Sequence, residues 1–214
     1  MSPVTTGETP REGDRDRAYG QGYELTFADR FGVWLSALRI RRMIPTFEGR
    51  DVGNFGCGFN ATFERTILDK VRSLTLVDVA LAPDLKDNPK VRAIEGILPD
   101  AIEQVPSDSL DVVLCVNVLE HLWDPQRALE GFRRVLRPGG VCFLNVPSWS
   151  GKVVLETLAF RMKLAPKEEM DDHKNYYSPR DLWRLVVASG FKPSNVICRP
   201  HKFGLNTYAV CKNG

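Results

Sequence analysis

The sequence has no long apolar run and no surplus of one charge. Apolar stretches such as 112–116 are far shorter than the roughly 20 residues that a membrane-spanning helix needs, and the polar N-terminus lacks the core of a signal peptide. Lysine and arginine number 29 against 27 acidic residues, so the formal net charge is only +2. Because phosphate binding draws on clustered positive charge, we expect a cytoplasmic protein that binds neither nucleic acid nor a membrane.

Cysteine is also scarce, and its residues are not grouped. The five cysteines include no CxxC pair, so the sequence predicts neither a disulfide framework nor a structural zinc site. We interpret them as small buried apolar residues; Cys57 differs only because it lies in a glycine-rich turn. They are Cys57, Cys115, Cys142, Cys198 and Cys211.

The length of 214 residues suits one domain, expected at 19–214. Residues 1–18 hold almost no large apolar side chain and predict a flexible tail. Residues 19–49 are expected to form an N-terminal helical segment, because apolar residues recur at helical spacing from 25 to 47. Pro45 should end that helix.

Beyond Arg50, short apolar runs alternate with helix-length segments, which predicts an α/β fold whose parallel sheet has helices on both faces. The expected strands are 51–55, 73–78, 91–95, 110–116 and 140–146, and the expected helices are 59–70, 79–88, 98–105 and 121–136. A helix at Pro179–Ala188 then precedes two strands near 194–199 and 205–212. Their short connection favours a hairpin, so the last strand should be antiparallel.

A glycine turn after the first strand predicts a ligand site. Gly56 and Gly58 allow a tight turn and a close approach of a ligand to main-chain N–H groups. Asp78 ends the next strand 20 residues after Gly58, the spacing at which an acid binds ribose hydroxyls in Rossmann-type sites. Together they indicate an adenosine-type ligand. The pattern Gly56-x-Gly58-x-x-Ala61 also fits a dinucleotide fingerprint, which leaves an NAD-dependent oxidoreductase as an alternative.

The segments that follow identify the ligand by resemblance. Residues 110–122 (LDVVLCVNVLEHL) and 124–140 (DPQRALEGFRRVLRPGG) closely resemble class I S-adenosylmethionine-dependent methyltransferases, in particular the small-molecule branch that includes the ubiquinone-biosynthesis O-methyltransferases. The resemblance covers about residues 50–147 and, more weakly, 173–191. It implies a Rossmann-like, mostly parallel sheet of seven strands in the order 3-2-1-4-5-7-6, with strand 7 antiparallel. It also implies S-adenosylmethionine as the cofactor.

The resemblance further assigns residues to that cofactor. Gly56 and Gly58 would pass under its methionine part, Asp78 would bind the ribose, and the residues after the third strand would flank adenine. Asn117 would face the methionine part and the reacting methyl group. The full set of expected cofactor contacts is Asn54, Gly56, Cys57, Gly58, Asp78, Val79, Glu95, Gly96, Ile97 and Asn117.

Two positions depart from the family pattern. Asn54 stands where members commonly carry an acid, two residues before the first glycine, and Asn60 replaces the third glycine. Asn54 can accept a hydrogen bond from the methionine ammonium but brings no charge. At Asn60 we expect the positive φ that glycine usually supplies. These departures leave open a methyltransferase-like protein that binds a ligand or partner without catalysis.

Methyl transfer from a sulfonium needs mainly alignment, and a hydroxyl acceptor also profits from a base. His121, after the fourth strand, is the first candidate, although a histidine there can equally hydrogen-bond within its own loop. Residues 147–178 form a long insertion expected to face the substrate, with His173, Tyr176 and Tyr177 as second-rank candidates. The sequence predicts no metal site, because the ligands near His121 are too few.

The sequence therefore predicts an enzyme that moves a methyl group from S-adenosylmethionine to an oxygen of a small-molecule acceptor, with nitrogen and carbon as second choices. A non-catalytic binding protein and the oxidoreductase stand as the alternatives. We expect a monomer or a homodimer.

Overall fold

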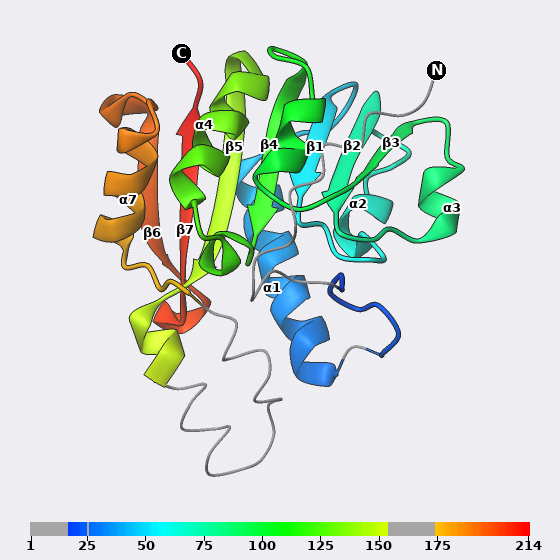
Figure 1. The fold of residues 1–214 in the computed structure, drawn as a ribbon. Coiled ribbons are helices and arrows are strands. Elements are labelled where there is room, and N and C mark those ends of the chain that lie inside the picture. The colour runs from blue at the N-terminus through cyan, green and yellow to red at the C-terminus, as the bar shows by residue number, and fades with distance from the viewer. Residues whose placement is uncertain (1–16, 25, 154–173) are drawn as a thin grey trace.

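Seven strands form one sheet in the order β3-β2-β1-β4-β5-β7-β6 (Figure 1). The computed structural model describes residues 17–24, 26–153 and 174–214. The strand β7 is antiparallel to both of its neighbours, and all other pairs are parallel. The strands are β1 (Asp51–Phe55), β2 (Ser73–Asp78), β3 (Val91–Glu95), β4 (Leu110–Val116), β5 (Leu136–Pro147), β6 (Val196–His201) and β7 (Asn206–Lys212). The predicted fold class, strand order and antiparallel last strand are confirmed.

Apolar runs form the central strands because both faces of a parallel sheet are covered. Val112, Val113 and Leu114 of β4 have no exposed surface. The strand order reverses between β1 and β4, and ligands of open α/β sheets bind beyond the carboxyl ends of the strands at such a point. The glycine turn follows β1 there, and residues 117–122 follow β4.

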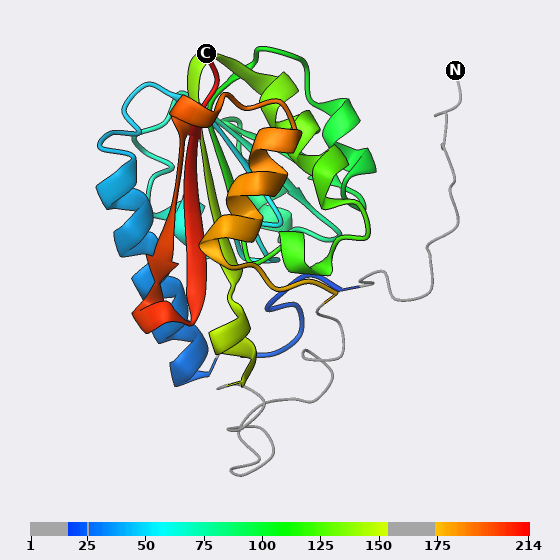
Figure 2. The same cartoon turned by 90° about the vertical axis from the view of Figure 1, so that its left-hand side faces the viewer.

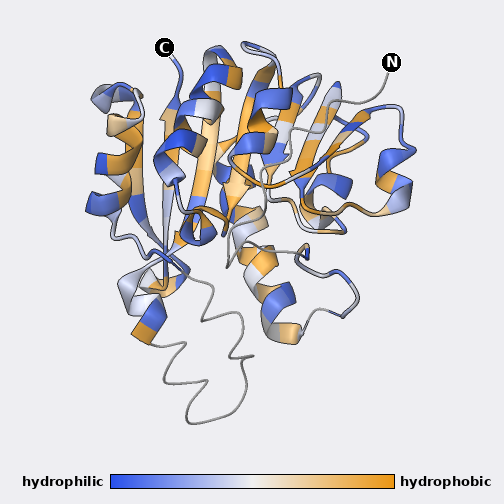
Figure 3. Ribbon diagram, in the orientation of Figure 1, coloured by the Kyte–Doolittle hydropathy of each residue, from blue (hydrophilic) through white to orange (hydrophobic). Residues whose placement is uncertain are grey.

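Helices cover both faces of the sheet. Figure 2 shows α1 (Phe27–Met43) on one face and α4 (Pro125–Val135) with α7 (Pro179–Ala188) on the other. The residues of α2 (Thr62–Arg65) and α3 (Pro83–Lys86) share a core with α1, whereas the 3-10 helix Asp100–Gln104 packs with α4 and α7. Apolar residues are concentrated on the strands and on the helix sides that meet them (Figure 3).

Several predicted helices are shorter than expected. Only α2 is helical within 59–70 and only α3 within 79–88, while 98–105 holds a 3-10 helix. The reason at α2 is local: its N-cap residue Ala61 has a φ of 41°, so the chain cannot be helical before it. The expectation that Asn60 takes the positive φ is therefore wrong, because Ala61 takes it.

The fourth predicted helix and the fifth strand also have different bounds. Helix α4 begins only at Pro125, where the Asp124 side chain accepts from the Arg127 N–H and caps the helix. It ends at Val135, and β5 begins at once with Leu136 instead of residue 140.

The predicted apolar stripe of α1 is largely exposed. Phe27, Phe31, Trp34 and Leu38 lie in solvent. The first turns of α1 extend past the carboxyl ends of β1 and β4, so these central strands do not cover them (Figures 1 and 2). The residues of α1 that join the core lie instead near its C-terminal end, where Ile40 is 2% exposed.

The described chain begins within the predicted tail. Ala18, which we assigned to residues 1–18, is buried, and its N–H donates to the Gln21 side chain at 3.1 Å. At the predicted insertion 147–178, residues 149–153 are helical. Residues 154–173, including His173, lie outside the described residues.

Candidate functional site at the carboxyl edge of the sheet

Two glycines shape the turn after β1. Gly56 and Gly58 have φ angles of 81° and 74°, a region that L side chains rarely adopt. A Cβ at Gly56 would lie 2.1 Å from Cγ2 of Val118, and one at Gly58 would lie 3.1 Å from the backbone oxygen of Tyr19. The turn is thus fixed between the end of β4 and residues 17–24, with no space for a side chain at Gly56.

The Asp78 carboxylate at the end of β2 binds this turn directly. The Gly58 N–H donates to Oδ2 at 2.7 Å, and the Val79 N–H donates to Oδ1 at 2.8 Å. Two backbone N–H groups thus hold this carboxylate against the turn. The glycine turn and the acid that the sequence paired by spacing are therefore hydrogen-bonded neighbours.

Asn54 lies beneath the turn, on the side of the sheet that α2 covers. Its Nδ2 donates to Oε1 of Glu64 at 2.6 Å, and both residues are buried. Among the described residues Oδ1 of Asn54 has no hydrogen-bond partner. A buried acceptor without a donor costs free energy, so Oδ1 suits a ligand that brings an N–H group.

Cys57, between the two glycines, is a neutral thiol. Its Sγ lies 3.9 Å from the Val77 carbonyl oxygen. Burial raises its pKa well above the usual value, and the nearby carboxyls of Glu64 and Asp78 raise it further. This environment agrees with our interpretation of Cys57 as a small apolar residue.

The residues after β3 lie beside Asp78. Oε1 of Glu95 accepts from Lys86 Nζ at 2.7 Å and from a backbone N–H after β2 at 2.8 Å, and the Lys86 ammonium lowers the pKa of Glu95. The Gly96 N–H donates to the backbone oxygen of Asp78 at 2.9 Å. Ile97 follows directly, so the expected adenine-side residues adjoin the expected ribose acid.

Asn117 follows β4 with a φ of 55°, a conformation that asparagine tolerates better than most residues. Its Oδ1 accepts from Nδ2 of Asn145 at 2.8 Å and from Nδ2 of Asn206 at 3.3 Å. The side chain is therefore held by β5 and β7, at the end of the strand that neighbours β1 and its glycine turn.

His121 lies in the 3-10 helix Leu119–His121 that follows β4. Its backbone oxygen accepts from Lys174 Nζ at 2.9 Å, and the Lys174 ammonium also lies 4.8 Å from the centre of the Trp123 ring. The Lys174 N–H donates to the Glu120 carbonyl at 2.8 Å. These contacts bind the end of the predicted insertion to the loop that carries His121.

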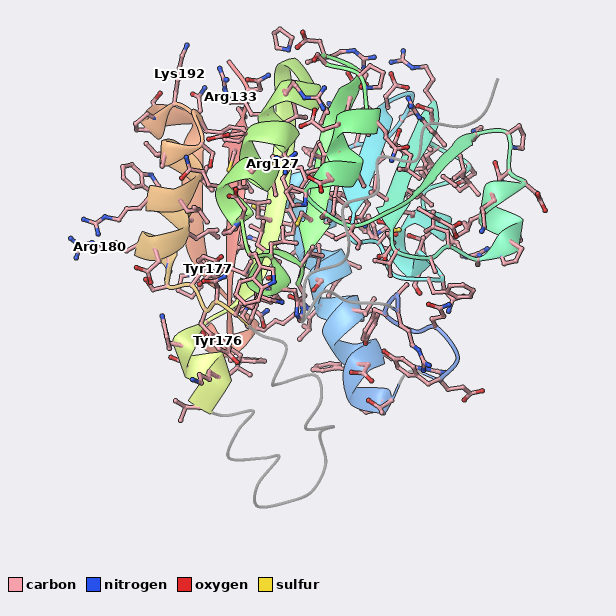
Figure 4. All side chains as sticks on the ribbon, in the orientation of Figure 1. Arg127, Arg133, Tyr176, Tyr177, Arg180 and Lys192 are labelled. Atoms are coloured by element: carbon pink, nitrogen blue, oxygen red, sulfur yellow. The ribbon has the colours of Figure 1, made fainter. Side chains whose placement is uncertain are left out.

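The two adjacent tyrosines have different environments, although both lie near the ends of the strands (Figure 4). The Tyr176 ring lies 5.5 Å from the Trp149 ring and is partly exposed. Tyr177 is buried, and its hydroxyl is 3.5 Å from the Leu119 carbonyl oxygen. Burial raises the pKa of Tyr177 above its usual range, which makes it a poor base at neutral pH.

Three residues near this edge did not emerge from the sequence. Glu64 could have been predicted from the sequence. It is an acid that closely follows the glycine turn, and the strand before that turn carries the uncharged Asn54 where the family commonly has an acid. Tyr19 contacts Gly58 from outside the recognised motifs. Lys202 lies between β6 and β7, and burial lowers its pKa to about 8; only the tertiary fold brings it to this edge.

Within the ranges that the structure describes, no three His, Cys, Asp or Glu side chains are grouped so that they could hold a metal ion. Over the same residues, no helix is both long enough and apolar enough to cross a membrane.

Comparisons with known proteins agree with this geometry. A family model described as "Methyltransferase domain" matches residues 30–195. The chain is 26% identical over 152 residues to a "Ubiquinone biosynthesis O-methyltransferase" of Aeromonas salmonicida, covering 66% of this chain and 63% of the relative. It is 33% identical over 170 residues to a Mycolicibacterium smegmatis protein named "Probable S-adenosylmethionine-dependent methyltransferase", covering 77% and 61%. The matches thus span less than two thirds of the length of these relatives.

A solved structure supports the fold. A "SAM dependent methyltransferase" from Archaeoglobus fulgidus superposes with a TM-score of 0.61 at 15% identity, over 87% of this chain and 100% of that one. The family match includes the chain from the glycine turn to α7. This chain therefore belongs to the methyltransferase-domain family, and it is similar to proteins named as S-adenosylmethionine-dependent and ubiquinone-biosynthesis methyltransferases.

Proposed function

We propose that this enzyme transfers a methyl group from S-adenosylmethionine to an oxygen of a small-molecule acceptor. The observation that carries the proposal is the grouping of the glycine turn, Asp78 and His121 at the carboxyl edge, where the strand order reverses. The preference for oxygen is supported by the name of the Aeromonas relative, an O-methyltransferase. The nearly balanced charge favours a small acceptor over nucleic acid.

In this proposal the chain binds the two ends of the cofactor separately. Asp78 accepts hydrogen bonds from the ribose hydroxyls, while the Gly58 and Val79 N–H groups hold its carboxylate at the turn. Glu95, Gly96 and Ile97 flank the adenine. The turn Gly56–Gly58, with Asn54 beneath it and Asn117 after the neighbouring strand β4, holds the methionine part.

The remaining side chains act on the acceptor. S-adenosylmethionine supplies an electrophilic methyl group on a sulfonium, so the protein contributes mainly alignment and exclusion of water. His121 takes the proton from the acceptor hydroxyl, because it follows β4 beside Asn117 and an imidazole suits this task near neutral pH. Tyr176 and Trp149 offer an aromatic surface to the acceptor. His173 stays a second candidate for the base, whereas the burial of Tyr177 favours a structural role.

The proposal is tested by methyl transfer from S-adenosylmethionine carrying a labelled methyl group. A panel of phenols, catechols, aliphatic alcohols, amines and thiols is incubated with the enzyme, and products are identified by mass spectrometry. We expect label on an oxygen of at least one hydroxyl acceptor. Label found only on nitrogen, carbon or sulfur would overturn the choice of oxygen.

A further inference from the structure

Glu64 is a buried carboxyl group that no sequence motif and no step of the proposed function uses. It projects from α2 and is 1% exposed, and its Oε1 accepts a hydrogen bond of 2.6 Å from Asn54. Burial raises its pKa to about 7 from an ordinary 4.5. Proteins seldom bury a carboxyl group this deeply without pairing it, so the position of Glu64 needs a physical reason.

The contact with Glu64 orients the Asn54 amide. Because the NH₂ group donates to Glu64, the oxygen Oδ1 must face away from it. That oxygen is buried and has no hydrogen-bond partner among the described residues. Asn54 stands two residues before Gly56, so the pair presents an acceptor without a donor directly beneath the glycine turn.

The groups around the pair bring no positive charge to it within the described part of the chain. The neighbouring Cys57 is a neutral thiol, because burial and Glu64 raise its pKa. Asp78, across the turn, is another acid. Arg41 of α1 and Arg65 of α2 are engaged by other side chains, at 2.7 Å and 2.6 Å. Among the described residues, burial and hydrogen bonds shift the pKa of Glu64 and no cation does, so the pair has acceptors and acids around it but no cation beside it.

We propose that Glu64 is a positioning residue for the cofactor: it holds Asn54 so that Oδ1 accepts from the methionine ammonium, and it supplies from α2 the negative charge that the strand position lacks. This inference rests on the proposed use of S-adenosylmethionine. The ammonium brings both missing elements, a donor for Oδ1 and a cation near Glu64. Because a nearby cation favours the ionised carboxyl, Glu64 releases its proton to solvent as the cofactor binds.

Two ligands that differ only at the amino-acid end test this role. S-adenosylhomocysteine carries the ammonium, whereas methylthioadenosine has the same adenosine but no amino-acid part. In Glu64→Gln, calorimetry should show S-adenosylhomocysteine binding weakened by about 10–100-fold, as expected for the loss of one nearby charge at intermediate dielectric. Methylthioadenosine should bind within about twofold of wild type, because Gln can still accept from Asn54.

An exchange variant and a proton measurement complete the test. Asn54→Asp combined with Glu64→Gln returns the acid to the strand and should restore most of the affinity for S-adenosylhomocysteine. In wild type at pH 7, titration in buffers of different ionisation enthalpy should reveal release of about half a proton, since Glu64 is half protonated when the pH equals its pKa. Methylthioadenosine should release none.

The outcomes distinguish a wrong role for Glu64 from a wrong cofactor. Equal weakening of both ligands by Glu64→Gln, or no weakening of either, overturns the role of Glu64 while leaving the cofactor in place. Absence of proton release from wild type overturns it without recourse to a variant. A wild-type protein that binds neither ligand overturns the proposed cofactor itself.

Discussion

The Gly58 N–H donates to the Asp78 carboxylate at 2.7 Å, which joins the glycine turn to the end of β2 across 20 residues of chain. The spacing alone predicted that both residues contact one ligand. The hydrogen bond adds that the acid also holds the turn in its observed conformation. A change at Asp78 should therefore affect both the ribose contact and the conformation of the loop.

Gly56→Ala should destabilise the protein more than the same change at Gly139. Both glycines have positive φ, but a Cβ at Gly56 would lie 2.1 Å from Val118, whereas nothing lies within 4 Å at Gly139. Gly139→Ala should lower the free energy of unfolding by about 1–2 kcal/mol through backbone strain. Gly56→Ala should lower it by a further ~1–3 kcal/mol through the clash. Urea unfolding measures both, and equal losses would contradict the packing described for the turn.

Asp51→Asn should destabilise the amino end of the sheet. Asp51 forms ion pairs with Arg72 and, at 2.8 Å, with Arg137, and the hydrogen bond from Arg72 holds its pKa well below the usual value. We expect a loss of about 1–2 kcal/mol at pH 7, because the exposed Arg72 is screened by solvent. Asp84→Asn is the control, since that acid pairs with Arg65 at the surface and should matter little.

The effect of Asp51 should depend on pH. A carboxyl whose pKa is lowered by folding contributes stability above its unfolded pKa, and this contribution is lost as the pH falls below about 4. The difference between wild type and Asp51→Asn should therefore be smaller at pH 3 than at pH 7. A constant difference over this range would show that the ion pairs do not set the pKa.

Glu64 should have the opposite pH dependence. Its pKa is raised in the folded state to about 7, so its contribution to stability is largest below the ordinary value of 4.5 and declines as the pH rises through 7. Glu64→Gln should thus raise the free energy of unfolding by about 1–3 kcal/mol at pH 8 and have little effect at pH 4. Unfolding curves at the two pH values measure this, and equal effects would rule out a buried titrating carboxyl.

His121→Ala should reduce catalysis and leave the cofactor in place. Loss of a general base typically costs about 10²–10⁴-fold in rate. We expect a fall of that order in kcat, with the affinity for S-adenosylhomocysteine within about twofold of wild type. An unchanged kcat would move the role of base to His173.

The sequence predicted the parts of this fold that depend on short-range pattern. The apolar run 110–116, bounded by turn residues, was predicted as a buried strand and is one. Gly58 and Asp78, which the sequence paired by their spacing, are joined by a hydrogen bond. The extent of the helices could not be predicted, because the positive φ of Ala61 comes from how the turn packs. The exposure of Trp34 depends on where the sheet ends beneath α1.

The site was predicted unevenly for a related reason. A sequence motif relates residues that are close in the chain, so the motif showed that Asn54 replaces the acid commonly found at its position. It could not show that Glu64, ten residues later, lies 2.6 Å from the Asn54 amide. Lys202 lies at this edge because the connection between β6 and β7 is there, which only the fold of the sheet shows.

Calorimetric titration of the wild-type protein with S-adenosylmethionine, repeated with Asp78→Ala, decides whether the carboxyl edge of the sheet binds this cofactor. We expect saturable binding at one site per chain, weakened by about 10–100-fold in the variant through loss of charge-assisted hydrogen bonds to the ribose. No binding at millimolar cofactor, or saturable binding of NADH in its place, would contradict it.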